Sequence, residues 1–215
     1  MKLTAVLFDM DGLITDSEAY GHEVLKSAGR QLGFELSDQL LYDMIGVNDV
    51  KCIETLNENY PGLDGAQVLQ MYRRAMYDAS VKGLVPLKPG VCELLDALDA
   101  HRIRRAVASS NDRFLVEGYL GRCGILQRFD ALVCGDMIRR SKPAPDIYLK
   151  AARRLQVPPS ACAGVEDSPS GLRSVRAAGM YAIMVPDQIP YTPALAPYAD
   201  AVLDSLHGLS RLLAL

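Results

Sequence analysis

Two aspartates directly follow the first apolar run of the chain, in the segment Asp9-Met10-Asp11-Gly12. In extended backbone, residues i and i+2 point to the same side, so the two carboxylates would face one way. Two neighbouring carboxylates repel each other unless a cation or a shared proton lies between them. Mg²⁺, which prefers oxygen ligands, would suit them. The alternative at this point is an ordinary Asp-Gly turn after a strand.

Three further polar segments of the sequence could complete a reactive site. They are Ser109-Ser110-Asn111, Ser141-Lys142-Pro143 and Glu166-Asp167. If the fold brings them to the two aspartates, four carboxylates would share one crevice and would need a divalent cation to neutralise them. Ser109 and Lys142 could then hold the non-bridging oxygens of a phosphoryl group, as phosphoryl transfer requires. An aspartate of the site can attack phosphorus and form an aspartyl phosphate.

Each of these segments also has a purely structural interpretation. Ser109 could cap the helix that follows it. Lys142 could be a solvated loop lysine, and Glu166 and Asp167 could be acidic residues at a helix start, where the helix dipole favours them. The functional interpretation depends on all the segments acting together, since each alone is common in proteins.

Apolar runs precede most of these polar segments and are typical of strands buried on both faces of a parallel sheet. We expect strands at 3–8, 105–108, 131–134, 161–165, 181–185 and 201–203. Helical patterns alternate with them, which predicts an α/β fold: a Rossmann-like parallel sheet with helices on both faces. In such sheets ligands bind at the carboxyl ends of the strands, where Asp9, Ser109 and Glu166 would lie.

The stretch from residue 16 to residue 85 carries helical patterns only. Leu25 and Ala28 recur at helical spacing, and Val68 and Leu69 begin another apolar helical face. The sequence therefore predicts a Rossmann-like catalytic core of residues 1–15 and 86–215, with an inserted all-helical domain of residues 16–85.

Composition excludes several classes of protein. The chain has 215 residues with 23 basic and 26 acidic side chains, a net charge of −3 and no basic block, so we expect no nucleic-acid partner. No apolar run approaches the ~20 residues of a membrane helix, so we expect no membrane association. Five scattered cysteines without a C-x-x-C pair are typical of reduced thiols, and we expect a cytoplasmic protein.

In this order, the polar segments resemble the four motifs of the haloacid dehalogenase superfamily of aspartyl-phosphate-forming hydrolases. The matching segments are 8–12, 108–111, 141–143 and 164–168. The helical stretch after the first motif is similar to the cap domain of the β-phosphoglucomutase-like and phosphatase branches. The resemblance covers essentially the whole chain, and the four motifs together are highly specific.

The resemblance implies a mechanism and a metal site. Asp9 would attack phosphorus, and Asp11 would protonate the leaving oxygen and later take a proton from the hydrolytic water. Mg²⁺ would be held by the Asp9 carboxylate, the backbone carbonyl of Asp11 and Asp167, with Glu166 bound directly or through water. Ser109 and Lys142 would anchor the phosphoryl group. The substrate-binding residues that we expect are Ser109, Ser110, Asn111, Lys142, Gly46 and Glu18.

The resemblance leaves a choice between hydrolysis and phosphoryl transfer within a sugar phosphate. It implies that the phosphomutase branch carries a cap histidine aligned with Gly21 and a cap arginine aligned with Asp49. This chain has a histidine one position later, at His22, and Asp49 would repel a second phosphate. Both departures favour hydrolysis over a phosphomutase of the β-phosphoglucomutase type.

Two further alternatives fit less well. A haloacid dehalogenase would need no metal and would lack the second aspartate, whereas Asp11 and the pair Glu166-Asp167 are present. A non-catalytic binding module would be expected to have lost one of Asp9, Asp11, Lys142 or Asp167. We therefore expect a Mg²⁺-dependent phosphatase that acts on a small phosphorylated metabolite, such as a sugar phosphate, as a monomer or weak homo-oligomer.

Overall fold

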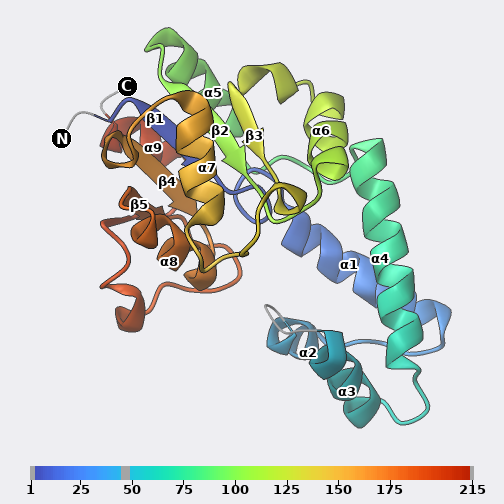
Figure 1. Ribbon diagram of the computed structural model, residues 1–215. Helices are drawn as coiled ribbons and strands as arrows, with labels where there is room; N and C mark the ends of the chain where they lie inside the picture. The colour runs from blue at the N-terminus through green and yellow to red at the C-terminus, as the bar shows by residue number, and fades with distance from the viewer. Residues whose placement is uncertain (1–2, 45–48, 214–215) are drawn as a thin grey trace.

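The computed structural model describes residues 3–44 and 49–213, and within them six parallel strands form one sheet in the order β3-β2-β1-β4-β5-β6 (Figure 1). The strands are β1 (Ala5–Phe8), β2 (Arg104–Ala108), β3 (Ala131–Val133), β4 (Cys162–Glu166), β5 (Tyr181–Met184) and β6 (Ala201–Val202). Every pairing between neighbours is parallel. The predicted parallel α/β sheet is confirmed, and β1, the strand before Asp9, lies inside it between β2 and β4.

Helices cover both faces of the sheet. Successive residues of β1 point to opposite faces, so each face presents apolar side chains that must be covered. Val6 and Phe8 belong to one buried apolar cluster, whereas Ala5 and Leu7 belong to another. The first cluster contains side chains of α5 (Val91–Ala100), α6 (Arg113–Arg122) and α9 (His207–Leu212), and the second contains side chains of α7 (Asp146–Leu155) and α8 (Pro169–Ala177). Short 3-10 helices lie at η1 (Leu126–Arg128), η2 (Gly135–Met137), η3 (Pro159–Ala161) and η4 (Pro193–Leu195).

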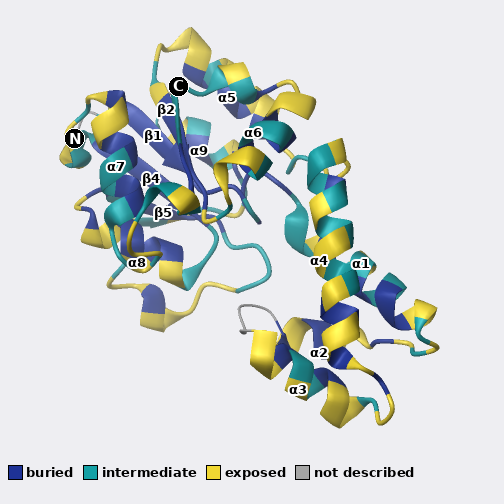
Figure 2. Ribbon diagram, turned by 45° about the vertical axis from the view of Figure 1, so that its right-hand side comes forward, coloured by how far each residue is buried: buried dark blue, intermediate teal, exposed yellow. Residues whose placement is uncertain are grey.

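Four of the described helices lie between β1 and α5, and we call them the helical insertion. They are α1 (Ser17–Gln31), α2 (Asp38–Asp43), α3 (Asp49–Asn59) and α4 (Gly65–Lys82). They enclose an apolar cluster of their own, which includes Leu25, Leu41, Leu56 and Val68. Figure 2 shows buried positions along the helices of the insertion. Helix α4 also packs against α6 of the core. Within the described ranges, none of the helices combines the length and the apolar character needed to cross a membrane.

Two chain segments join the helical insertion to the core, and they run side by side. The backbone N–H of Asp16 donates to the carbonyl of Pro86 (2.8 Å), and that of Lys88 donates to the carbonyl of Ile14 (2.9 Å). The ammonium of Lys88 also pairs with the carboxylate of Asp16 (2.9 Å). Because the first segment starts at the end of β1, this junction positions the insertion beside the polar residues that follow that strand.

Candidate active site

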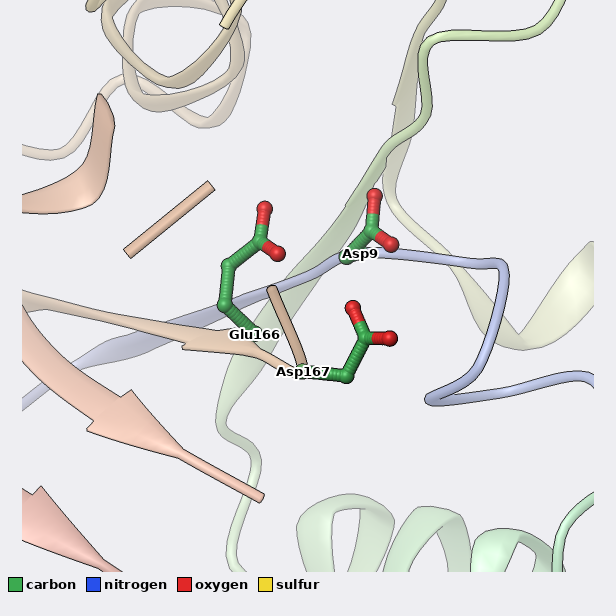
Figure 3. Close-up of side chains that lie close together, drawn as sticks. All are labelled: Asp9, Glu166 and Asp167. Carbon is green, nitrogen blue, oxygen red and sulfur yellow. The ribbon is translucent and has the colours of Figure 1, made fainter. Parts of the chain in front are cut away.

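Three carboxylates converge at the carboxyl ends of β1 and β4. Asp9 follows β1, Glu166 is the last residue of β4, and Asp167 comes next. Figure 3 shows the three side chains pointing toward one another, and one oxygen from each lies within 4.8 Å of the others. The two strands pair in parallel register, with Phe8 opposite Val165, so the residues that follow them emerge side by side. This is the juxtaposition expected for the ends of adjacent parallel strands.

The donor set of these carboxylates fits a hard divalent cation. Asp9 is 8 % exposed and Glu166 is fully buried. Burial raises the pKa of Asp9 to about 7 and that of Asp167 to about 9, and repulsion between the carboxylates contributes to both shifts. Neighbouring buried carboxylates repel one another when they are ionised. A cation between them stabilises their ionised form. Asp9, Glu166 and Asp167 therefore form a candidate metal centre.

Lys142 supplies a fixed positive charge to the same site. Its Nζ lies 2.6 Å from Oε1 of Glu166 and also forms an ion pair with Asp9. Burial alone would lower the pKa of Lys142, but the charges of Asp9 and Glu166 outweigh it and raise that pKa above its ordinary value. The structure thus brings Lys142 to the first and fourth polar segments as a buried, charged side chain and not as a solvated loop lysine.

Asp11 lies apart from the three carboxylates and is held by a different partner. Nδ2 of Asn111 donates a hydrogen bond of 2.6 Å to Oδ2 of Asp11. Burial raises the pKa of Asp11, although hydrogen bonding to Ser17 and Asn111 and the charge of Lys142 oppose the shift. A carboxyl group with a raised pKa is suited to general acid–base work. Among the described residues, the side chain of Asp11 does not belong to the group of carboxylates that could hold a metal ion. Binding of the metal by the backbone carbonyl of Asp11 stays a prediction.

Ser109 does not cap the helix after β2, so that structural alternative is wrong. Asp112 occupies the N-cap position of α6. Ser109 is fully buried, and its Oγ accepts a hydrogen bond of 3.1 Å from the backbone N–H of Asn111. This local bond shapes the turn that carries Asn111 to Asp11, while the exposed residue Ser110 lies between them.

The side chains that fix Glu166 had no role at the site predicted from the sequence. The hydroxyl of Tyr148 donates to Oε1 of Glu166 (2.6 Å), and Oγ of Ser168 donates to Oε2 (3.1 Å). A Cβ at Gly171 would overlap the carboxylate, so only glycine lets α8 pass this close to Glu166. A glycine inside a helical pattern was an available signal for Gly171. Tyr148 offered none, because an aromatic residue on an amphipathic helix is usually part of the core.

A pocket in the helical insertion is lined in part by Glu18, which lies near Asp11. Its lining includes Glu18, Gly21, Asp49, Tyr72 and Arg73. Burial raises the pKa of Glu18, and the nearby charges of Asp11 and Asp187 add to the shift. Asp49 forms an ion pair with Arg73, so its charge is balanced and the expected repulsion of a second phosphate is weakened. Gly46, also expected to bind substrate, lies outside the described residues.

Comparison with known proteins agrees with this geometry. Residues 6–185 match the family described as haloacid dehalogenase-like hydrolase. The chain is 29% identical to a phosphorylated carbohydrates phosphatase of Thermotoga maritima, over 83% of this chain and 82% of that protein. It is also 29% identical to the beta-phosphoglucomutase of Bacillus subtilis, over 95% of this chain and 94% of that protein.

Solved structures and longer relatives extend the comparison. A HAD family hydrolase from Deinococcus radiodurans R1, solved with bound phosphate and sodium, superposes with a TM-score of 0.82 at 26% identity, covering 99% of this chain and 95% of that one. The chain spans only 18% of one longer relative, the chloroplastic protein SUPPRESSOR OF QUENCHING 1 of Arabidopsis thaliana, at 32% identity over 86% of this chain. With the family matched across most of its length and the carboxylates assembled at the expected strand ends, the chain belongs to the haloacid dehalogenase-like hydrolases.

Proposed function

We propose that the protein is a Mg²⁺-dependent phosphatase that hydrolyses a small phosphate monoester, a sugar phosphate or a similar metabolite, through an aspartyl-phosphate intermediate. The observation that carries this proposal is the buried contact of Lys142 with both Asp9 and Glu166. This contact supports the proposal because it brings together a carboxylate that could attack phosphorus, an ammonium that could bind phosphate and oxygens that could hold a metal ion. Phosphoryl transfer requires these groups to position the phosphate and to stabilise its charge.

Asp9 is the nucleophile of this mechanism. One of its carboxylate oxygens attacks phosphorus, the bond from phosphorus to the leaving oxygen breaks, and the side chain becomes an aspartyl phosphate. Lys142 and Ser109 hold the non-bridging oxygens while charge shifts to the leaving oxygen. Mg²⁺ bound by Asp9, Glu166 and Asp167 would neutralise part of the phosphoryl charge.

Asp11 transfers the protons. It donates one to the leaving oxygen and then accepts one from the water that hydrolyses the aspartyl phosphate. The raised pKa of Asp11 favours a bound proton before the first step. Asn111 orients the carboxyl through its hydrogen bond to Oδ2.

We assign residues 16–85 to a cap domain and residues 1–15 and 86–215 to the catalytic core. The separate apolar cluster of the helical insertion and its paired junction support this division. The pocket beside Glu18 would recognise the part of the substrate beyond the phosphate, and closure of the cap would exclude bulk water. Cys92, Cys123, Cys134 and Cys162 lie in the described parts of the chain as free thiols, which supports a cytoplasmic location.

A phosphomutase of the β-phosphoglucomutase type is the second candidate. Arg73 lines the pocket of the insertion and supplies a cation that a second phosphate would need. The charge of Asp49 opposes this role, because its carboxylate already occupies the guanidinium. Hydrolysis therefore remains the better-supported reaction.

Phosphate release from a panel of sugar phosphates and other small monoesters, measured with Mg²⁺ and with chelator, tests the proposal. We expect release that depends on Mg²⁺ and is lost in Asp9→Asn. Formation of an isomeric sugar phosphate, with little free phosphate, would favour the phosphomutase. Turnover that survives complete chelation would contradict the metal-dependent mechanism.

A further inference from the structure

Asp187, in the loop after β5, is a buried carboxylate that the proposed mechanism does not use. Its side chain is 10% exposed, and its Oδ1 lies 2.6 Å from Nζ of Lys88. Its Oδ2 is one of two buried side-chain atoms that have no hydrogen-bond partner among the described residues; the other is Nε of Arg128, whose guanidinium pairs with Asp96 and Asp99. A buried carboxylate oxygen without a partner is costly, so its surroundings indicate what it is built to bind.

The unpartnered oxygen lies beside Gly12, as does Oδ2 of Asp167 in the candidate metal centre. The backbone of Gly12 has a φ of +72°, and a Cβ built there would overlap Oδ2 of Asp167 and lie 3.3 Å from Oδ2 of Asp187. Both carboxylate oxygens therefore lie close to the point where any other residue would carry a side chain. Only glycine at position 12 leaves this approach open.

Two carboxylates in this arrangement need a donor between them. They repel each other if both are ionised, and Lys88 contacts Oδ1 of Asp187, which leaves Oδ2 without a proton donor. Mg²⁺ in proteins keeps several of its water ligands, and those waters are strong donors. A carboxylate one layer beyond the direct ligands orients such waters.

We propose that Asp187 is an outer-sphere residue of the metal centre, whose Oδ2 accepts a hydrogen bond from a water bound to the metal beside Asp167. The proposal rests on the proposed Mg²⁺ dependence. Lys88 holds the carboxylate by its other oxygen and pairs with Asp16 at the same time. The metal centre is thereby connected to the junction between the core and the helical insertion.

Calorimetric titration with Mg²⁺ alone, in the absence of substrate, tests this role. Asp187→Asn keeps an oxygen that accepts from Lys88, but it puts an amide NH2, which donates and does not accept, in the place of the unpartnered oxygen. We expect its dissociation constant for Mg²⁺ to rise about tenfold relative to the wild type, as removal of outer-sphere partners does at other metal sites. Asp16→Asn is the matched control, because it alters the other partner of Lys88 without touching the oxygen beside Gly12, and it should bind Mg²⁺ as the wild type does.

The outcomes separate this inference from the proposed function. If the wild type binds no Mg²⁺, the proposed metal dependence is wrong, and the outer-sphere role of Asp187 is wrong with it. If the wild type and Asp187→Asn bind Mg²⁺ equally, the outer-sphere role is wrong and the proposed function stands. Equal weakening in Asp16→Asn would also overturn it, since the effect would then come from the junction. Thermal unfolding in chelator checks that each variant is folded, and Asp187→Ser replaces Asp187→Asn if that variant is not.

Discussion

The hydroxyl of Tyr148 donates a hydrogen bond of 2.6 Å to Oε1 of Glu166, and both side chains are fully buried. The same oxygen lies 2.6 Å from Nζ of Lys142, which is also 5.4 Å from the centre of the Tyr148 ring. One tyrosine from α7 therefore contacts both a candidate metal ligand and the candidate phosphate-binding cation. Its hydroxyl fixes the carboxylate, and its ring limits where the ammonium can lie.

Tyr148→Phe should therefore lower both stability and turnover while keeping the ring. We expect the free energy of unfolding to fall by about 1.5–3 kcal/mol, the range for a hydrogen bond to a charged group. Urea denaturation measures this value, and phosphate release measures turnover. Tyr191→Phe, at a partly exposed tyrosine of the core, is the control and should change neither. Unchanged stability in Tyr148→Phe would show that Glu166 does not depend on the hydroxyl.

Asp9→Asn should abolish turnover without unfolding the protein. The amide cannot attack phosphorus, and we expect phosphate release to fall by about 10⁴-fold or more. The amide oxygen still offers Lys142 an acceptor, and one of the mutually repelling charges is removed, so the melting temperature in chelator should not fall. Asp204→Asn, at an exposed aspartate, removes the same charge and should keep full activity. Wild-type rates in Asp9→Asn would overturn the mechanism.

Asp11→Asn should impair proton transfer, which contributes about 10²–10⁴-fold to rates. The leaving group determines whether formation or hydrolysis of the aspartyl phosphate is slowed more. With p-nitrophenyl phosphate, whose leaving group needs little protonation, the first step should persist while hydrolysis of the aspartyl phosphate slows. Rapid-mix kinetics should then show a burst of nitrophenol close to one per enzyme. A variant without a burst, slowed equally on all substrates, would place Asp11 outside the second step.

The metal-free protein should lose stability as the pH rises from about 4 to about 9. The pKa of Asp9 rises from 3.8 to about 7 and that of Asp167 from 3.8 to about 9 on folding, mainly through burial. The folded state therefore binds more protons than the unfolded state in this window, and the free energy of unfolding falls with pH. The raised pKa of Lys142 acts only above 10.5. Urea denaturation in chelator at about pH 5 and about pH 8 measures the difference.

Added Mg²⁺ should remove this loss, because a ligand that binds only the folded state stabilises it. The stabilisation should be larger at the higher pH, where the metal no longer competes with bound protons. Stability that rises with pH in chelator would show that the carboxylates are not the dominant titrating groups.

Gly171→Ala and Gly118→Ala should have opposite effects on stability, although both lie inside helices. A Cβ at Gly171 would overlap the Glu166 carboxylate, whereas nothing lies within 4 Å of a Cβ at Gly118. We expect Gly171→Ala to cost about 1–3 kcal/mol or more, as overpacking does. Gly118→Ala should add up to about 1 kcal/mol through helix propensity. Urea denaturation of both variants tests the contrast, and equal effects would show that α8 can move away from Glu166.

The sequence alone was enough to predict the sheet, the helical stretch after its first strand and the strand ends at which Asp9, Glu166 and Asp167 lie, but not the separate position of the Asp11 side chain. Strands such as β1 and β4 are short apolar runs, and the polar residues Asp9, Glu166 and Asp167 follow directly in the chain. Because parallel strands end at the same edge of a sheet, local patterns determined which of these side chains would meet.

How the charges pair depends on contacts that form only in the folded chain. Lys142 contacts both Asp9 and Glu166, Asp49 is neutralised by Arg73, and the cap role considered for Ser109 is wrong. These contacts join residues whose separation in the chain carries no periodic signal.

The contacts of Asp187 are the clearest example of contacts that sequence patterns do not predict. Lys88 and Asp187 are 99 residues apart, and the orientation of Oδ2 toward Gly12 depends on how the loop after β5 lies against the end of β1. The sequence determined the chemistry available at the strand ends, since residue type and strand position are local properties. Packing between distant segments decided which atoms share a proton, a charge or a metal, because those contacts depend on distances that no spacing along the chain encodes.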